Sequence, residues 1–164
     1  MKMNALGLIA LVLLFTSVSV VAQKNADIEK NKDLINVYTE DFWNKQNIAA
    51  FEKYYASDFI VHFADGDMNV EQYKGLCQAY FAAFPDIHVS TDLLVAEGDK
   101  VTKVWTVHST NKGDFMGIPA TGKPMVVKGI EVFRIADGKI AELWASMDNL
   151  GMLQQLGVIP PLGE

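Results

Sequence analysis

The chain has 164 residues, a formal net charge of −6 and a hydrophobic content of 50%. This length suits one domain with a sizeable core. An acidic chain without a basic cluster lacks the positive surface that binds nucleic acid, so no nucleic-acid partner is expected. A single cysteine, Cys77, excludes an intrachain disulfide. Its helical spacing from Tyr73, Tyr80 and Phe81 predicts a buried, unreactive side chain.

Part of the apolar content lies in residues 1–22. Lys2 gives this segment a positive start, residues 5–21 are almost wholly apolar, and Ala22 is the small residue that a signal peptidase needs. We therefore expect a signal peptide over residues 1–22 and a mature domain over residues 23–164. That domain is then exported to the periplasm or the extracellular space and has no membrane contact after cleavage. The alternative is a permanent anchor, because about seventeen apolar residues lie at the lower limit for spanning a bilayer.

Three helical patterns occupy the first half of the mature chain. Residues 25–44 carry apolar side chains at spacings of three, four and seven, which is typical of an amphipathic helix. Asn47 can cap a second, shorter helix. Asn69, with Gln72 three positions later, resembles a capping box that opens a third helix, and Pro85 ends it.

The second half is rich in β-branched and aromatic residues and predicts strands. Asp137-Gly138 supplies the positive φ that a two-residue hairpin turn needs. The loop over residues 113–124 is long enough to act as a lid, and a fixed connection or a dimer contact are its alternatives. A last short helix over residues 150–156 ends at Gly157. The predicted strands are residues 59–63, 87–97, 101–110, 125–135 and 139–147.

Helices therefore precede strands instead of alternating with them. This order indicates an α+β fold in which three N-terminal helices pack on one face of a curved, mostly antiparallel sheet. Such a sheet, closed by helices, leaves a cone with an open mouth. A cavity of that kind is a natural site for a small molecule.

Several motifs, in their order and spacing, resemble a known family. They are residues 55–59 with His62, residues 84–86, residues 97–99, residues 113–123, residues 133–140 with Glu142, Trp144 and Asp148, and residues 155–157. Together they make the chain similar to the SnoaL-like polyketide cyclases, or ester cyclases, of the nuclear-transport-factor-2-like superfamily. The resemblance implies the cone-shaped fold and ring closure by an intramolecular aldol reaction, and superfamily members commonly form homodimers.

The chain departs from that family at two positions. The resemblance places the catalytic acid of the cyclases on the last strand, at the position of Ala145. A Gly-Thr-His triplet at the end of the strand that carries Trp105 appears here as Ser109-Thr110-Asn111. An alanine cannot transfer a proton, so any acid/base chemistry needs another side chain.

Three residues are the catalytic candidates. Glu131 alternates with Gly129 and Phe133, which suggests an inward-facing carboxylate, and a salt bridge to Lys103, Lys128 or Arg134 is its structural alternative. Asp148 is a second candidate acid, or a helix cap. His62 lies on a short strand and can change protonation near neutral pH, or is simply an edge-strand histidine.

Aromatic and Met side chains are the ligand-binding candidates, with membership of the core as their alternative. No pattern predicts a metal site, and no glycine-rich phosphate loop predicts a cofactor. The expected partner is a small hydrophobic or carbonyl-bearing molecule, bound with or without cyclase or isomerase chemistry. A non-catalytic binding module and a homodimeric interaction protein are the alternatives. The ligand-binding candidates are Tyr38, Tyr55, Trp105, Phe115, Met116 and Trp144, with Met147 as a further cavity-lining candidate.

Overall fold

The computed structural model describes residues 23–160. Residues 23–38 are α-helical and continue into the π-helix η1 (Thr39–Asn44). A 3₁₀ turn, η2 (Ile48–Ala50), leads into the short α2 (Phe51–Tyr54). The two remaining helices are α3 (Val70–Ala83) and α4 (Asn149–Leu156).

Six strands form one sheet in the order β2-β1-β6-β5-β4-β3. Neighbouring strands are antiparallel except β1 and β6, which run parallel. The mostly antiparallel α+β architecture expected from the sequence is thus confirmed. The strands are β1 (Tyr55–Phe63), β2 (Gly66–Asn69), β3 (His88–Glu97), β4 (Lys100–Thr110), β5 (Pro124–Ala136) and β6 (Lys139–Met147).

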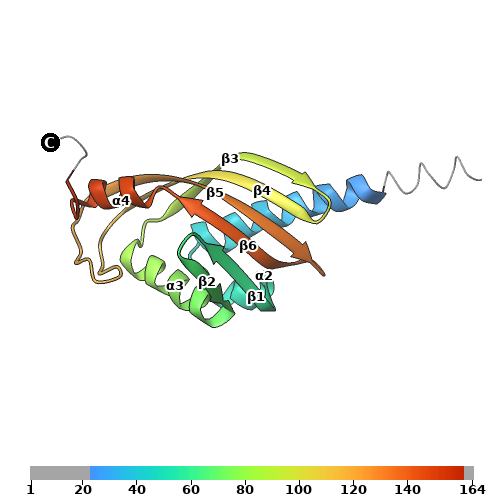
Figure 1. The fold of residues 1–164 in the computed structure, drawn as a ribbon, viewed down its shortest axis with the longest axis horizontal. Helices are drawn as coiled ribbons and strands as arrows, with labels where there is room; N and C mark the ends of the chain where they lie inside the picture. The colour runs from blue at the N-terminus through green and yellow to red at the C-terminus, as the bar shows by residue number, and fades with distance from the viewer. Residues whose placement is uncertain (1–22, 161–164) are drawn as a thin grey trace, which may run out of the picture.

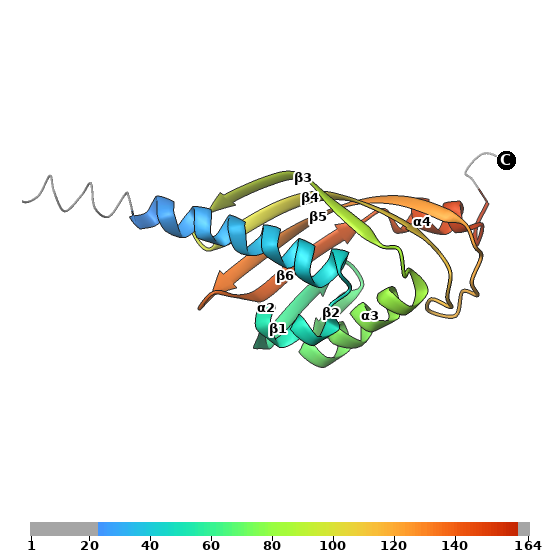
Figure 2. The ribbon, with the colours of Figure 1, turned by 180° about the vertical axis from the view of Figure 1, so that it is seen from behind.

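The N-terminal helix and α3 lie on the same side of the curved sheet (Figures 1 and 2). Their apolar faces meet inward side chains of the strands, so a core of aromatic and aliphatic residues fills the space between the layers. We call this covered side the inner face of the sheet. The other side, the outer face, exposes several large apolar side chains, including Leu93, Val95 and Ile130.

Local sequence signals placed two element boundaries well. Asn69 accepts a hydrogen bond from the Gln72 amide, and the Gln72 side chain accepts one from the Asn69 amide, so the capping box is confirmed. Asp137 and Gly138 have φ values of 50° and 73°, and the hairpin between β5 and β6 turns there as predicted.

The region around β1 differs from the prediction. The second helix ends at Tyr54, and the chain is already extended at Tyr55, where the predicted strand had not yet begun. The predicted polar loop after Phe63 is a tight hairpin, because Gly66 opens β2 and pairs with Phe63. Both differences reflect pairing with partner strands, which local propensity does not reveal.

The predicted signal peptide over residues 1–22 lies outside the described residues, so export stays a prediction. Within residues 23–160, no helix combines the length and the apolar character that crossing a membrane requires.

Candidate functional site

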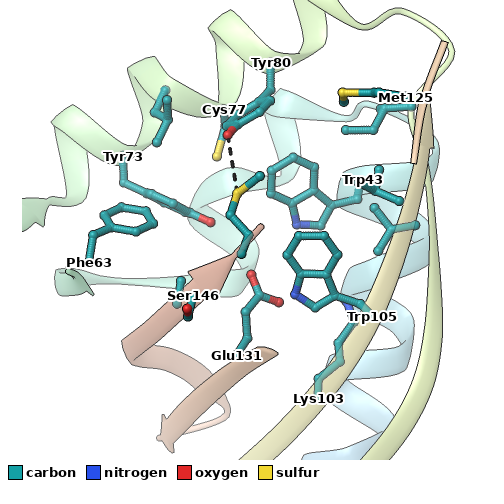
Figure 3. Close-up of a pocket in the computed structure, with 16 residues that line it drawn as sticks. Trp43, Phe63, Tyr73, Cys77, Tyr80, Lys103, Trp105, Met125, Glu131 and Ser146 are labelled. Carbon is teal, nitrogen blue, oxygen red and sulfur yellow. Dashed lines mark hydrogen bonds between the residues drawn. The ribbon is translucent and has the colours of Figure 1, made fainter. Parts of the chain in front are cut away.

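A cavity lies between the inner face of the sheet and the helices η1 and α3 (Figure 3). The space open to the centres of water molecules is about 80 Å³. A single water needs on the order of 10–15 Å³ by this measure, so the cavity can hold a small organic molecule. Its wall is predominantly apolar, and the large side chains that form it are Trp43, Phe63, Tyr73, Tyr80, Trp105, Met125 and Met147.

Glu131 brings a carboxylate into this apolar cavity. It lies on β5, directly opposite Lys103 on β4 and Ala145 on β6, and its exposed fraction is 9%. In the described part of the chain no cation lies within ion-pair distance of this carboxylate. Burial raises the pKa of Glu131 because the charged form loses its water, and the Lys103 charge and the nearby Trp105 indole N–H only partly oppose this effect.

Lys103 is the second charged side chain of the cavity, with an exposed fraction of 1%. Its Nζ donates a hydrogen bond to Thr39 Oγ1 at 2.9 Å, and Thr39 Oγ1 donates to the Ile35 carbonyl at 2.8 Å. Burial lowers the pKa of Lys103, against the opposing charges of Glu131 and Glu40. The π-helix η1 supplies Thr39 to this lysine and Trp43 to the cavity wall; such segments often occur at functional sites.

Trp105 lies beside Glu131 because of a glycine on the neighbouring strand. Gly129 is its cross-strand partner, and a Cβ added there would lie 2.3 Å from the indole Cζ2. The missing side chain lets the indole lie across β5 with its nitrogen toward Glu131 (Figure 3). Nε1 of Trp105 is buried and points at the Glu131 carboxylate, but it makes no hydrogen bond of ordinary length and angle with any described residue.

One face of α3 closes the cavity from the helical side. Tyr73, Cys77 and Tyr80 follow each other at spacings of four and three and all line it. The Tyr80 hydroxyl donates to Met147 Sδ at 3.8 Å (Figure 3). Burial raises the pKa of the Cys77 thiol far above its usual value, so this cysteine is neutral and the predicted buried role is confirmed.

The structure separates the three catalytic candidates. Only Glu131 lines the cavity. His62 points to the outer side, where its Nδ1 lies 2.9 Å from Asp67 Oδ1 and its ring stacks on Trp144. Asp148 caps α4, with its carboxylate accepting the Gly151 amide at 2.8 Å, so the helix-cap alternative describes its position. Neither His62 nor Asp148 belongs to the cavity lining.

The ligand-binding candidates are divided in the same way. Trp105 lines the cavity, and so does Met147, whereas Trp144 lies on the outer face. Tyr38 and Tyr55 are buried in the core and hydrogen-bond to each other through their hydroxyls.

Phe115 and Met116 lie on the loop between β4 and β5, away from the cavity lining. Phe115 is buried with its ring 4.6 Å from that of Tyr80, whereas Met116 is 74% exposed. Hydrogen bonds within this loop and to the end of α3 hold it in place in this structure. Asn111, at the position of the family's triplet histidine, is buried, accepts the Thr121 amide and donates to the Gly113 carbonyl. The amide of Gly113 in turn donates to the Ala83 carbonyl at the end of α3.

Sequence reasoning did not assign Trp43, Tyr73, Tyr80 or Lys103 to the ligand space. The helical spacing on α3 was visible, but the same spacing is typical of a core face. For the metal question, residues 23–160 contain no group of three or more His, Cys, Asp or Glu side chains suited to hold an ion.

Comparisons with known proteins agree with this geometry. The family model of the SnoaL-like polyketide cyclases matches residues 15–156. AclR, a candidate hydroxylase from Streptomyces galilaeus, superposes with a TM-score of 0.77 at 26% identity, over 84% of this chain and 87% of its own. IdmH, a candidate polyketide cyclase from Streptomyces antibioticus, gives 0.67 at 30% identity, over 77% of this chain and 98% of its own.

A candidate polyketide cyclase from Acidithiobacillus ferrooxidans gives a TM-score of 0.70 at 32% identity, over 79% of this chain and 95% of its own. Among curated protein sequences, none matches the chain.

Proposed function

Because this chain belongs to the SnoaL-like polyketide cyclase family, we propose that its cavity binds a small, mostly apolar carbonyl compound, on which Glu131 acts as a cofactor-free acid/base catalyst. The observation that carries the proposal is the burial of the Glu131 carboxylate in an apolar cavity, without an ion-pair partner among the described residues. Structural ion pairs are the usual reason for a buried carboxylate, and none among the described residues includes Glu131.

The chemistry follows from the raised pKa of Glu131. An ionised carboxylate with a raised pKa is a stronger base than an ordinary glutamate, and its protonated form is still acidic enough to return the proton. Glu131 would remove a proton from the carbon next to a carbonyl, giving an enolate. In a ring closure, that carbon attacks a second carbonyl of the same molecule, and the resulting alkoxide takes the proton back from Glu131.

The position of Ala145 supports this assignment. The family resemblance places the catalytic acid of the cyclases at that position, and Ala145 is the direct cross-strand partner of Glu131. Directly paired residues on antiparallel strands have Cβ atoms roughly 4.5–5.5 Å apart. A carboxylate one strand across can therefore serve the same part of the cavity.

The alanine also keeps a second candidate function open, a binding module that holds its ligand without reacting. In that case Glu131 would recognise a polar group of the ligand, and exchange of protons next to its carbonyl would not be accelerated.

Deuterium exchange distinguishes the two functions without knowledge of the natural substrate. The protein is incubated in D₂O with acetophenone and a series of larger aromatic ketones, and NMR follows the loss of the proton next to the carbonyl. We expect exchange above the buffer rate, lost by about 100-fold or more in Glu131→Gln, because general-base catalysis typically contributes 10²–10⁴-fold.

Glu142→Gln is the matched control, since Glu142 lies on the neighbouring strand outside the cavity lining. Its exchange rate should stay within about twofold of the wild type. Equal rates in wild type and Glu131→Gln would refute the catalytic proposal. Ketone binding without exchange would establish the binding module instead.

A further inference from the structure

We propose that the indole Nε1–H of Trp105 is the hydrogen-bond donor that holds the carbonyl oxygen of the ligand and places the adjacent carbon at Glu131. The part that concerns catalysis rests on the proposed function. The binding contact itself does not depend on any reaction.

The first observation is an unpaired donor. Nε1 of Trp105 is the buried side-chain polar atom that has no hydrogen-bond partner among residues 23–160, and the residue as a whole is only 9% exposed. Leaving such a group without an acceptor costs about 1–3 kcal/mol, so native proteins rarely keep one without a reason. A ligand oxygen in the cavity would supply the missing acceptor.

The second observation is that three other donors of the cavity wall are engaged. Trp43 Nε1 donates to the Tyr38 hydroxyl at 2.6 Å, and the Tyr80 hydroxyl donates to Met147 Sδ. Lys103 Nζ donates to Thr39 Oγ1. The hydroxyls of Tyr73 and Ser146 also line the cavity, but the indole Nε1 of Trp105 is the wall donor that is fully buried without a partner among the described residues.

The third observation is that the direction of this donor is fixed. The indole lies over Gly129, where any side chain would overlap it, and its nitrogen points toward the Glu131 carboxylate (Figure 3). A carbonyl oxygen that accepts from Nε1 therefore lies on the Glu131 side of the indole. The carbon next to that carbonyl comes within reach of the carboxylate.

This arrangement suits the electronic demand of the proposed reaction. When Glu131 takes the proton, the electron pair of the broken C–H bond moves toward the carbonyl, and the oxygen becomes negatively charged. A neutral donor already in place gains strength as this charge develops and stabilises the enolate more than the ketone. The inference thus names the ligand class as a compound with a carbonyl that has a hydrogen on the neighbouring carbon.

NMR of the ¹⁵N-labelled protein tests the contact directly. The chain has three tryptophans, so the indole region should show three N–H signals, and the Trp105 signal is the one that Trp105→Phe removes. Acetophenone is the probe, and ethylbenzene, which has nearly the same shape without the oxygen, is its control. We expect acetophenone to shift the Trp105 indole proton downfield and ethylbenzene not to do so.

Trp43 and Trp144 provide internal references, because the first already donates to Tyr38 and the second lies on the outer face. Trp105→Phe keeps most of the aromatic bulk and loses the donor. In this variant the ratio of the affinities for acetophenone and ethylbenzene should fall toward one. The rate of deuterium exchange should fall by about 10²–10³-fold, as in other enzymes that lose one such donor.

The outcomes separate this inference from the proposed function. If the Trp105 signal does not move at any acetophenone concentration, saturating concentrations included, the inference is overturned. A downfield shift without any effect of Glu131→Gln on exchange supports the contact and refutes the catalysis. Exchange that depends on Glu131 but is unchanged in Trp105→Phe supports the catalysis and overturns the role of the indole.

Discussion

Glu131 and Glu142 are carboxylates on neighbouring strands, and the two faces of the sheet give them opposite properties. Glu142 is half-buried on β6 and accepts a hydrogen bond from Arg134 Nε at 2.8 Å, which lowers its pKa. Glu131 faces inward from β5, and burial raises its pKa. The same functional group is thus a member of a surface ion pair on one face and a candidate base on the other.

The difference shows what a carboxylate needs to become reactive. An ion-paired carboxylate is held in its charged form and binds protons poorly at neutral pH. A desolvated one without an ion-pair partner remains close to its protonated state, which a proton-transferring group requires. The residue type is the same in both places, so the surroundings decide the chemistry.

The largest effect on stability is expected at the tightest contact of the inner face. Gly129→Ala puts a Cβ into the indole of Trp105, and overpacking of this kind costs about 1–3 kcal/mol. Gly75→Ala is the control, because a Cβ at this exposed position of α3 would meet open space. Replacing this helical glycine by alanine should stabilise the protein by about 0.5–1 kcal/mol. Urea unfolding measures both, and a neutral Gly129→Ala would show that the indole is free to move.

The next effect is a pH dependence of opposite sign for the two glutamates. The folded protein keeps Glu131 protonated at pH values at which the unfolded chain has already released this proton. Wild-type stability therefore falls as the pH rises from the unfolded pKa of Glu131 to its folded pKa. Glu131→Gln should therefore gain stability relative to wild type with rising pH, by about 1.4 kcal/mol for each unit of pKa shift. The titratable groups around this carboxylate are Lys103, Tyr38, Tyr73 and Cys77.

The tyrosines and Cys77 stay neutral below pH 8, because burial raises their pKa values. Lys103 loses the nearby negative charge in Glu131→Gln, which lowers its pKa further and acts in the same direction. Glu142→Gln should behave oppositely and lose stability relative to wild type as the pH rises. The pKa of Glu142 is lowered in the folded protein, so its ion pair stabilises the fold fully only at pH values above the pKa of the unfolded chain. Thermal melts from about pH 2 to 8 cover the intervals of both glutamates and measure both slopes, and equal signs would contradict the comparison.

The smallest effect concerns Asp148 at the end of β6. Asp148→Ala removes the cap of α4 and should cost about 1 kcal/mol, whereas Asp148→Asn keeps a capping oxygen and should restore most of that loss. Thermal unfolding of the two variants gives the difference. A tenfold loss of deuterium exchange in the well-folded Asn variant would instead make the Asp148 carboxylate the reacting group.

The candidate site was only partly predictable. The alternation of Glu131 with Gly129 and Phe133 indicated an inward-facing carboxylate, which the structure places in the cavity. Alternation on β6 predicted that Glu142, Trp144, Ser146 and Asp148 share one face; Glu142 and Trp144 lie outside the cavity lining, whereas Ser146 belongs to it. It did not reveal that this face lacks the helical layer, so Trp144 was assigned to the ligand space although it lies on the outer face.

By itself, the sequence determined what short-range chemistry controls. The capping box at Asn69, the positive φ at Asp137 and Gly138, and the strand and helix periods were all legible because each depends on residues a few positions apart. The family motifs, read in order, also determined the fold.

Only the tertiary structure decided which faces are covered and which side chains meet. The cavity joins η1, α3 and the inner face of the sheet, so its lining depends on contacts between segments far apart in the chain. The pairing of Trp105 with Gly129, and the distance of Glu131 from any ion-pair partner in the described chain, depend on strand register and on burial. Burial belongs to the assembled layers and not to a local pattern, which is why the chemistry of Glu131 emerged only from the fold.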